Sequence, residues 1–206
     1  MTAPDLTKSQ VRDALQTDAE TLARLSAYVD LLTKWQKRIN LVAPKTLEEV
    51  WRRHVLDSAQ LLPLMAEIPG PVLDLGSGAG FPGLVLAVLG RGDITLVESD
   101  RRKAAFLSEA ARVTGARVAI ECCRIESLKP IRAGLITARA LAPVSKLLEY
   151  AKSYSDDSTR YLFLKGERVD EELTDAQKHW NMNVTKVPSR SDSRGTIVLL
   201  EGVTHA

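Results

Sequence analysis

A turn with three glycines at alternate positions constrains the fold of this chain more than any other stretch. A short apolar run ends at Asp74, and Gly76, Gly78 and Gly80 follow at once. After Pro82 and Gly83 comes a second apolar segment. This order predicts a buried strand, a tight turn and the start of a helix. Glycine at such a turn lets the backbone bend sharply and lets a ligand approach the main chain without meeting a Cβ.

An acid at the end of the next apolar run indicates a ligand. Residues 94–97 predict the second strand, and Glu98 follows it directly. In a βαβ unit an acid at this place accepts hydrogen bonds from ribose hydroxyls. The glycine turn and Glu98 together therefore predict a nucleoside-containing cofactor.

The identity of the cofactor depends on finer details of the turn. Residues 78–83 satisfy the dinucleotide pattern G-x-G-x-x-G, but that pattern alone is weak. Asp74 stands where its carboxylate would repel a bound pyrophosphate, and it would suit the ammonium or sulfonium group of S-adenosylmethionine. The order D-x-G-x-G-x-G is also the usual methyltransferase form of this loop. We favour S-adenosylmethionine over a dinucleotide, and a glycine turn without a ligand is the remaining alternative.

Composition excludes several classes of protein. The chain has 206 residues, 45% hydrophobic and 26% charged, which is ordinary for one globular core with a small appendage. It has no apolar run of membrane-spanning length and no signal-peptide pattern, so we expect a cytoplasmic protein that binds no membrane. The only cysteines, Cys122 and Cys123, are adjacent. We expect them to be small buried residues at a strand end, and we expect no metal site.

The small net charge of +2 conceals an uneven distribution. Residues 34–53 contain six Lys or Arg against two Glu, and residues 99–146 contain ten against four acids. Two basic stretches suit a polyanionic partner such as nucleic acid. The alternative is that these side chains are simply the solvated faces of helices.

Residues 1–69 predict a helical N-terminal extension. Capping boxes are indicated at Thr7-x-x-Gln10 and at Thr46-x-x-Glu49. An apolar stripe at helical spacing predicts one long helix, formed by Leu22, Leu25, Val29, Leu32, Trp35 and Ile39. A further helix is expected from Thr46 to Leu62.

Residues 70–206 predict an α/β domain with a Rossmann-like sheet. We expect strands near 72–75, 94–98, 117–121, 134–138 and 160–165, and helices near 82–90, 100–114, 143–154 and 168–179. Residues 182–187 and 195–200 predict a closing hairpin. The result is a seven-stranded, mostly parallel, doubly wound sheet. Ligands bind at the carboxyl ends of such strands, so we expect one edge to gather Asp74, Glu98, Cys122 to Glu126, Arg139 and Lys165.

Several motifs together resemble one known family, the bacterial GidB-type methyltransferases that methylate guanine N7 in 16S ribosomal RNA. The resemblance runs from about Leu31 to about Glu172. Its motifs are Trp35-x4-Asn40-Leu41, Arg53-His54-x-x-Asp57-Ser58, the segment from Asp74 to Gly83, Arg124-Ile125-Glu126, Arg139-Ala140 and Leu164-Lys165-Gly166. It implies the class I S-adenosylmethionine-dependent methyltransferase fold, with 16S rRNA or the small ribosomal subunit as partner. The alternatives are a methyltransferase acting on a small molecule or protein, and a nonenzymatic or redox nucleotide-binding protein.

The resemblance also assigns residues to the cofactor. It implies that Gly76 and Phe81 line the cofactor pocket, that Ile125 and Glu126 border the adenine, and that Arg139 completes the site. One departure is Ala138, where a serine is expected, and the tail after Glu172 matches only loosely. With the glycine turn and Glu98, the candidate cofactor-binding residues are Asp74, Gly76, Gly78, Gly80, Phe81, Glu98, Ile125, Glu126 and Arg139.

Guanine N7 carries an in-plane lone pair, so its methylation needs positioning more than a general base. Arg139 is the first candidate for a residue shared between cofactor and RNA, and Lys165 is the next, for phosphate or base contact. For Arg124 a functional and a surface role are equally supported. We expect His54 to belong to an internal cluster with Arg53 and Asp57. We expect Trp35 in the core and Trp51 as a base-stacking candidate.

Overall fold

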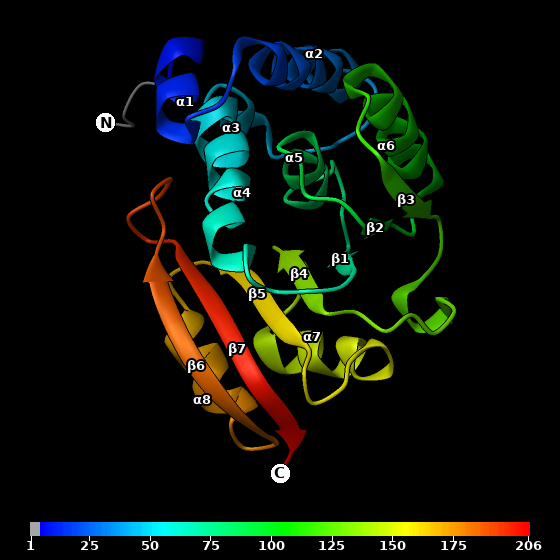
Figure 1. The fold of residues 1–206 in the computed structure, drawn as a ribbon, viewed down its shortest axis with the longest axis vertical. Helices are drawn as coiled ribbons and strands as arrows, with labels where there is room; N and C mark the ends of the chain where they lie inside the picture. The colour runs from blue at the N-terminus through cyan, green and yellow to red at the C-terminus, as the bar shows by residue number, and fades with distance from the viewer. Residues whose placement is uncertain (1–4) are drawn as a thin grey trace.

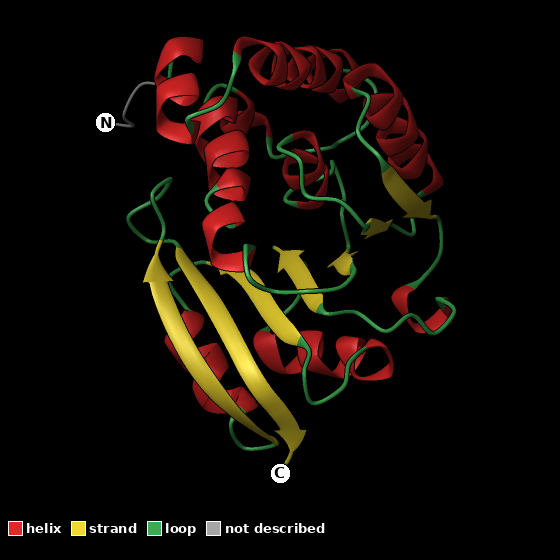
Figure 2. Ribbon diagram, viewed as in Figure 1, coloured by secondary structure: helices red, strands yellow, loops and turns green. Residues whose placement is uncertain are grey.

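The computed structural model describes residues 5–206, and a seven-stranded sheet with the order β3-β2-β1-β4-β5-β7-β6 forms its centre (Figures 1 and 2). The strands are β1 (Val72–Leu75), β2 (Ile94–Val97), β3 (Val118–Glu121), β4 (Leu135–Arg139), β5 (Arg160–Lys165), β6 (Trp180–Pro188) and β7 (Thr196–His205). β1 to β5 are parallel to one another, whereas β7 runs antiparallel to β5 and β6. The predicted seven-stranded, mostly parallel sheet with a closing hairpin is confirmed.

Helices cover both faces of the sheet. They are α1 (Lys8–Leu15), α2 (Ala19–Gln36), α5 (Gly83–Val88), α6 (Arg101–Thr114), α7 (Val144–Ala151) and α8 (Val169–Ala176). One core cluster joins the apolar faces of α1, α2, α5 and α6, and a second lies under α7 and α8. Because it is covered on both faces, β1 is buried at all four positions. The first cluster continues across residues 69 and 70, so the helical extension and the sheet share one core.

The first two helices form as their sequence predicts. The capping box at the start of α1 is confirmed, because Gln10 N donates to the Thr7 hydroxyl and Thr7 N donates to the Gln10 side chain. The apolar stripe of α2 faces the core. Trp35, at its end, packs edge-on against Phe106 with the ring centroids 5.6 Å apart, so the expected core role of this tryptophan is confirmed.

The single helix predicted from Thr46 to Leu62 is wrong. In its place the chain forms four short pieces: α3 (Pro44–Leu47), the π-helix η1 (Trp51–Leu56), α4 (Asp57–Ala59) and the 3₁₀-helix η2 (Leu62–Met65). The predicted capping box is absent because the Thr46 hydroxyl donates to Ala43 O and contacts His54, while Glu49 pairs with Arg52. A π-helical turn is wider than an α-helical turn and is frequent at functional sites.

Two predictions about exposure are also wrong. Trp51, expected to stack on bases, is buried in the core because η1 packs its apolar side inward. Cys122 is exposed and Cys123 is half-buried, because they follow β3 at the edge of the sheet. Within residues 5–206, no helix has the length and apolar character needed to cross a bilayer. The same residues contain no group of three or more His, Cys, Asp or Glu side chains placed to hold a metal.

Candidate active site

One large cavity lies at the carboxyl ends of the five parallel strands and has a volume of about 1040 Å³. The glycine turn and the segments after β2, β3, β4 and β5 line one part of it. Residues 41–57 and the loop between β6 and β7 line the rest. Ligand cavities are typically about 300–1,000 Å³, so this one lies at the upper end of that range.

The glycine turn after β1 brings bare backbone to the cavity wall. Gly76, Gly78 and Gly80 all have positive φ, which glycine adopts without strain. A Cβ built on Gly76 would lie 2.7 Å from the Leu141 side chain, whereas one on Gly78 would meet only the Gly76 carbonyl, at 3.8 Å. Gly76 and Gly78 line the cavity. Gly80 does not, and it lets the turn approach Tyr28 of α2.

Glu98 connects this turn to the end of β2. One carboxylate oxygen accepts a hydrogen bond from Gly78 N at 2.9 Å, and the other accepts from Asp100 N at 2.7 Å. Only 8% of Glu98 is exposed, but the residue lines the cavity. Each carboxylate oxygen can accept more than one hydrogen bond, so Glu98 can hold the turn and still accept from a ribose.

Asp74 lies beneath the turn and not on the cavity wall. It is fully buried, and its Oδ1 accepts a hydrogen bond from the Thr137 hydroxyl at 2.7 Å. Within residues 5–206 its Oδ2 has no hydrogen-bond partner. Burial raises the pKa of this carboxyl from 3.8 to about 6. A direct contact of Asp74 with the cofactor stays a prediction, and in this structure its carboxylate is enclosed by protein.

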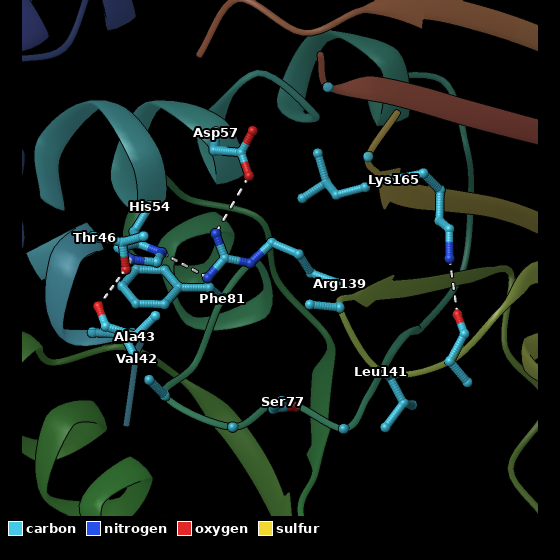
Figure 3. Close-up of a pocket in the computed structure, with 18 of the residues that line it drawn as sticks. Val42, Ala43, Thr46, His54, Asp57, Ser77, Phe81, Arg139, Leu141 and Lys165 are labelled. Atoms are coloured by element: carbon cyan, nitrogen blue, oxygen red, sulfur yellow. Dashed lines mark hydrogen bonds and ion pairs between the residues drawn. The ribbon is translucent and has the colours of Figure 1, made fainter. Parts of the chain in front are cut away.

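Arg139, the last residue of β4, is held by the turn of η1 (Figure 3). Its Nη1 donates to Arg53 O at 3.1 Å and to Asp57 Oδ2 at 3.3 Å, and its Nη2 donates to His54 Nδ1 at 2.8 Å. The guanidinium carbon lies 4.9 Å from the centre of the Phe81 ring. Burial lowers the pKa of Arg139, and the carboxylate of Asp57 opposes that change.

His54 completes this cluster from the other side. Its ring stacks on Phe81 with the centroids 4.9 Å apart, and its Nε2 lies 2.8 Å from the Thr46 hydroxyl. Burial, with the charges of Arg139 and Arg53, lowers the His54 pKa to about 3, so the ring is neutral. The expected cluster of Arg53, His54 and Asp57 forms only indirectly, because the three residues meet at Arg139 and not through bonds between their own side chains. Sequence reasoning identified Arg139 as a site residue but did not connect it to this block, because the two are separated by 82 to 86 positions.

The segment after β3 forms another wall of the cavity. Arg124, Ile125 and Glu126 all line it; Ile125 is buried, whereas the other two are exposed. The 3₁₀-helix η3 (Ile125–Ser127) starts here, and the buried Tyr154 hydroxyl donates to Ile125 O. An apolar side chain beside an exposed acid is suited to the face and the polar edge of an adenine.

Lys165, at the end of β5, lines the cavity but is engaged by the protein. Its ammonium group lies 2.6 Å from Glu172 Oε2 and donates to Ala142 O at 2.8 Å. Only 7% of its side chain is exposed. A contact of Lys165 with RNA stays a prediction, and it would require this ammonium group to rearrange.

The loop between β6 and β7 contributes to the site, which sequence reasoning missed. Ser189 and Ser191 line the cavity, and both hydroxyls donate to Asp57 Oδ1, at 3.3 and 2.5 Å. Asp192 pairs with Arg53. The polar run 188–194 predicts a hairpin turn, but no local pattern indicates that the turn folds back onto residues from the N-terminal segment.

Comparison with solved structures identifies the class of fold. The chain aligns with ribosomal protein L11 methylase from Lactobacillus delbrueckii subsp. bulgaricus with a TM-score of 0.59 at 16% identity, covering 70% of this chain and 76% of that one. It aligns with magnesium protoporphyrin IX methyltransferase from Synechocystis with a TM-score of 0.57 at 12% identity, covering 90% and 98%. The sheet order and both alignments show that the chain has the fold of class I methyltransferases.

Sequence relatives narrow this class to one family. Residues 21–197 match GidB, rRNA small subunit methyltransferase G. A protein of that name from Rhodospirillum rubrum is 50% identical over 187 residues, covering 91% of this chain and 93% of the relative. One from Paramagnetospirillum magneticum is 50% identical over 200 residues, covering 97% and 95%. The chain belongs to the GidB family, which confirms the resemblance found in its motifs.

Proposed function

We propose that this protein transfers a methyl group from S-adenosylmethionine to N7 of one specific guanine in the 16S ribosomal RNA of the small subunit. The observation that carries the proposal is the family match, because residues 21–197 include every residue that lines the cavity. The reaction would take place in the cytoplasm, on the small subunit or on its RNA.

The glycine-turn side of the cavity fits S-adenosylmethionine, which when bound supplies a methyl group on a positively charged sulfur. The open space beside Gly78 admits a ligand to the backbone. Glu98 would accept hydrogen bonds from the ribose hydroxyls, and Ile125 and Glu126, which also line the cavity, would border the adenine. The buried carboxyl of Asp74, when ionised, would supply negative potential behind the turn that favours a cationic donor.

The remaining side of the cavity would hold the acceptor nucleotide. It lies between residues 41–57, Lys165 and the loop that contains Ser189 and Ser191. A base in a folded RNA must leave its stack to enter such a pocket. Lys165 and the exposed Arg124 would contact phosphate or the base edge, and Arg139, between the two parts, would contact both ligands.

The charges around Arg139 suit attack by N7. The base gains positive charge as N7 is methylated, so an unpaired cation near N7 would oppose the reaction. Asp57 pairs with Arg139 and compensates its charge. Arg139 would therefore hold guanine O6 or a phosphate and leave N7 free for the methyl group. His54 is neutral and both of its ring nitrogens have partners, so it supplies no base, and N7 needs none.

The test is methyl transfer from labelled S-adenosylmethionine to small subunits from a strain that lacks the enzyme, followed by mapping of the modified base. A single N7-methylguanosine in 16S RNA is expected. Label in another base would reject the N7 assignment. No transfer to subunits or naked RNA, with S-adenosylmethionine still bound, would reject the RNA substrate and favour a methyltransferase acting on a small molecule or protein.

A further inference from the structure

We propose that His54 is a positioning residue, which fixes the Arg139 guanidinium through a neutral ring nitrogen that accepts its hydrogen bond. The proposal gives a role to the Arg53-His54-x-x-Asp57 block. It rests on the proposed function in one respect, that Arg139 acts on the ligands in the cavity.

The first support is that one turn of the chain supplies three acceptors to one side chain. Arg53 O and Asp57 Oδ2 accept from Nη1 of Arg139, and His54 Nδ1 accepts from Nη2. All three belong to or adjoin the π-helix η1. The wide π-helical turn thus points a main-chain carbonyl, a ring nitrogen and a carboxylate at the same guanidinium group.

The second support is that the hydrogen-bond chain through His54 has only one possible direction. Arginine has donors and no acceptor, so His54 Nδ1 must be unprotonated and the proton of the neutral ring lies on Nε2. Nε2 therefore donates to the Thr46 hydroxyl, which in turn donates to Ala43 O at 2.7 Å (Figure 3). Each hydrogen bond in this series is donated in the same direction, from Arg139 through His54 and Thr46 to the main-chain carbonyl of Ala43. The series therefore selects the His54 tautomer that is protonated on Nε2.

The third support is that a neutral ring fits this place better than another acceptor would. Asp57 already compensates the charge of Arg139, so a second carboxylate would leave the cluster with a net negative charge. A neutral imidazole holds the guanidinium without adding charge. The His54 ring also stacks on Phe81, and the Arg139 guanidinium lies over the same Phe81 ring. His54 and Phe81 thereby restrict the position of the guanidinium beside the glycine turn.

Two amide variants separate this role from simple packing. In His54→Asn the side-chain oxygen can occupy the place of Nδ1 and accept from Arg139. In His54→Gln the amide reaches the place of Nε2, so the contact with Thr46 is kept and the acceptor for Arg139 is lost. Both variants lose the ring. We expect His54→Gln to lower kcat for methylation of small subunits by on the order of 10- to 100-fold, the scale for misplaced reacting groups, and His54→Asn to recover most of it.

Thermal melting and S-adenosylmethionine affinity of both variants are the matched controls. Equal losses of kcat in two variants of equal stability would overturn the proposal, as would full activity in both. Methylation of small subunits by the wild-type protein is measured before the variants are compared. If the wild type does not methylate them, the proposed function is rejected and not the role of His54.

A measurement on the unmodified protein covers the case in which the variants do not fold. Nitrogen-15 NMR of the histidine rings distinguishes a protonated from an unprotonated nitrogen. We expect His54 to show an unprotonated Nδ1 and a protonated Nε2 near neutral pH, with no change on acidification to about pH 5, well above its lowered pKa. A proton on Nδ1 would overturn the proposal, because that nitrogen could not accept from Arg139.

Discussion

The Lys165 ammonium group lies 2.6 Å from the Glu172 carboxylate, and this pair joins the end of β5 to α8 at the cavity wall. Glu172 also accepts a hydrogen bond from Val144 N at the start of α7, at 3.1 Å. One carboxylate therefore holds three elements together beside the expected acceptor position. Any movement of Lys165 toward RNA would exchange this partner for a phosphate.

Removing that carboxylate should destabilise the protein. Glu172→Ala leaves the ammonium group of Lys165, whose side chain is only 7% exposed, without its partner. We expect the free energy of unfolding in urea to fall by about 3 kcal/mol, the lower end of the range for broken buried ion pairs. Asp175→Ala on the same helix is the control, because its pair with Lys178 is well exposed and should contribute little. Equal effects of the two substitutions would contradict the prediction.

Alanine at Gly80, in the glycine turn, should destabilise the protein more than alanine at Gly90, a glycine of similar backbone conformation outside the turn. Gly80 and Gly90 have φ of +91° and +99°, so alanine is strained at both by about 1–2 kcal/mol. At Gly80 the new Cβ would also lie 2.9 Å from Leu84 and 3.0 Å from the Tyr28 hydroxyl, whereas nothing lies within 4 Å at Gly90. Gly80→Ala should therefore cost about 1–3 kcal/mol more than Gly90→Ala in denaturant unfolding. Similar costs would show that α2 can move away from the turn.

Asp74 should make the wild-type protein less stable as the pH rises. Its pKa is about 6 in the folded state against 3.8 for an exposed carboxyl, so the folded state binds the proton more tightly. The unfolding free energy therefore falls as pH rises from about 4 to about 6, and the full penalty is present above the folded pKa. Two pKa units correspond to at most about 3 kcal/mol.

Asp74→Asn removes this titration and provides the comparison. The difference in unfolding free energy, wild type minus variant, should become less favourable to the wild type between about pH 4 and pH 7, as followed by urea denaturation. The titrations of other groups cancel in that difference. A constant difference over this range would mean that Asp74 has an ordinary pKa in the folded protein.

Glu98 should account for recognition of the ribose. We expect Glu98→Ala to weaken S-adenosylmethionine binding by about 1–3 kcal/mol in calorimetry, since ribose hydroxyls lose their acceptor. Because Glu98 also holds Gly78 N and Asp100 N, part of that loss could reflect a looser turn. A 2′-deoxy analogue of S-adenosylhomocysteine separates the two effects. The wild type should bind it more weakly than S-adenosylhomocysteine, and Glu98→Ala should bind both alike. An equal preference in both proteins would place the ribose elsewhere.

The elements around the glycine turn were predictable because their signals are local. Alternating apolar runs and breakers locate each of the five parallel strands within one residue, whereas β7 extends five residues beyond its predicted end. The turn itself is recognisable from its glycines and Glu98. The exposure of Cys122 depends on β3 being an edge strand, which the order of strands along the chain does not reveal. The burial of Trp51 depends on how η1 packs against the core, which the neighbouring arginines do not reveal.

The individual residues of the candidate site were predictable from the sequence, but the contacts between them were not. Arg139 is recognisable at the end of a strand, and Asp57 as part of a motif, yet nothing local indicates that they form a pair. The same holds for Ser191, which reaches Asp57 from more than a hundred residues away. Such contacts follow from the packing of the whole chain and not from the pattern of any one segment.

The double attachment of Asp57, to Arg139 on one side and to the loop of Ser189 and Ser191 on the other, has a consequence for biosynthesis. A growing polypeptide completes the glycine turn and Glu98 about ninety residues before it reaches Ser189. The far wall of the cavity closes only after the last hairpin has emerged and folded back. A nascent chain that stops before this loop would thus lack one wall of the cavity, and Asp57 would lack the hydroxyl donors of Ser189 and Ser191.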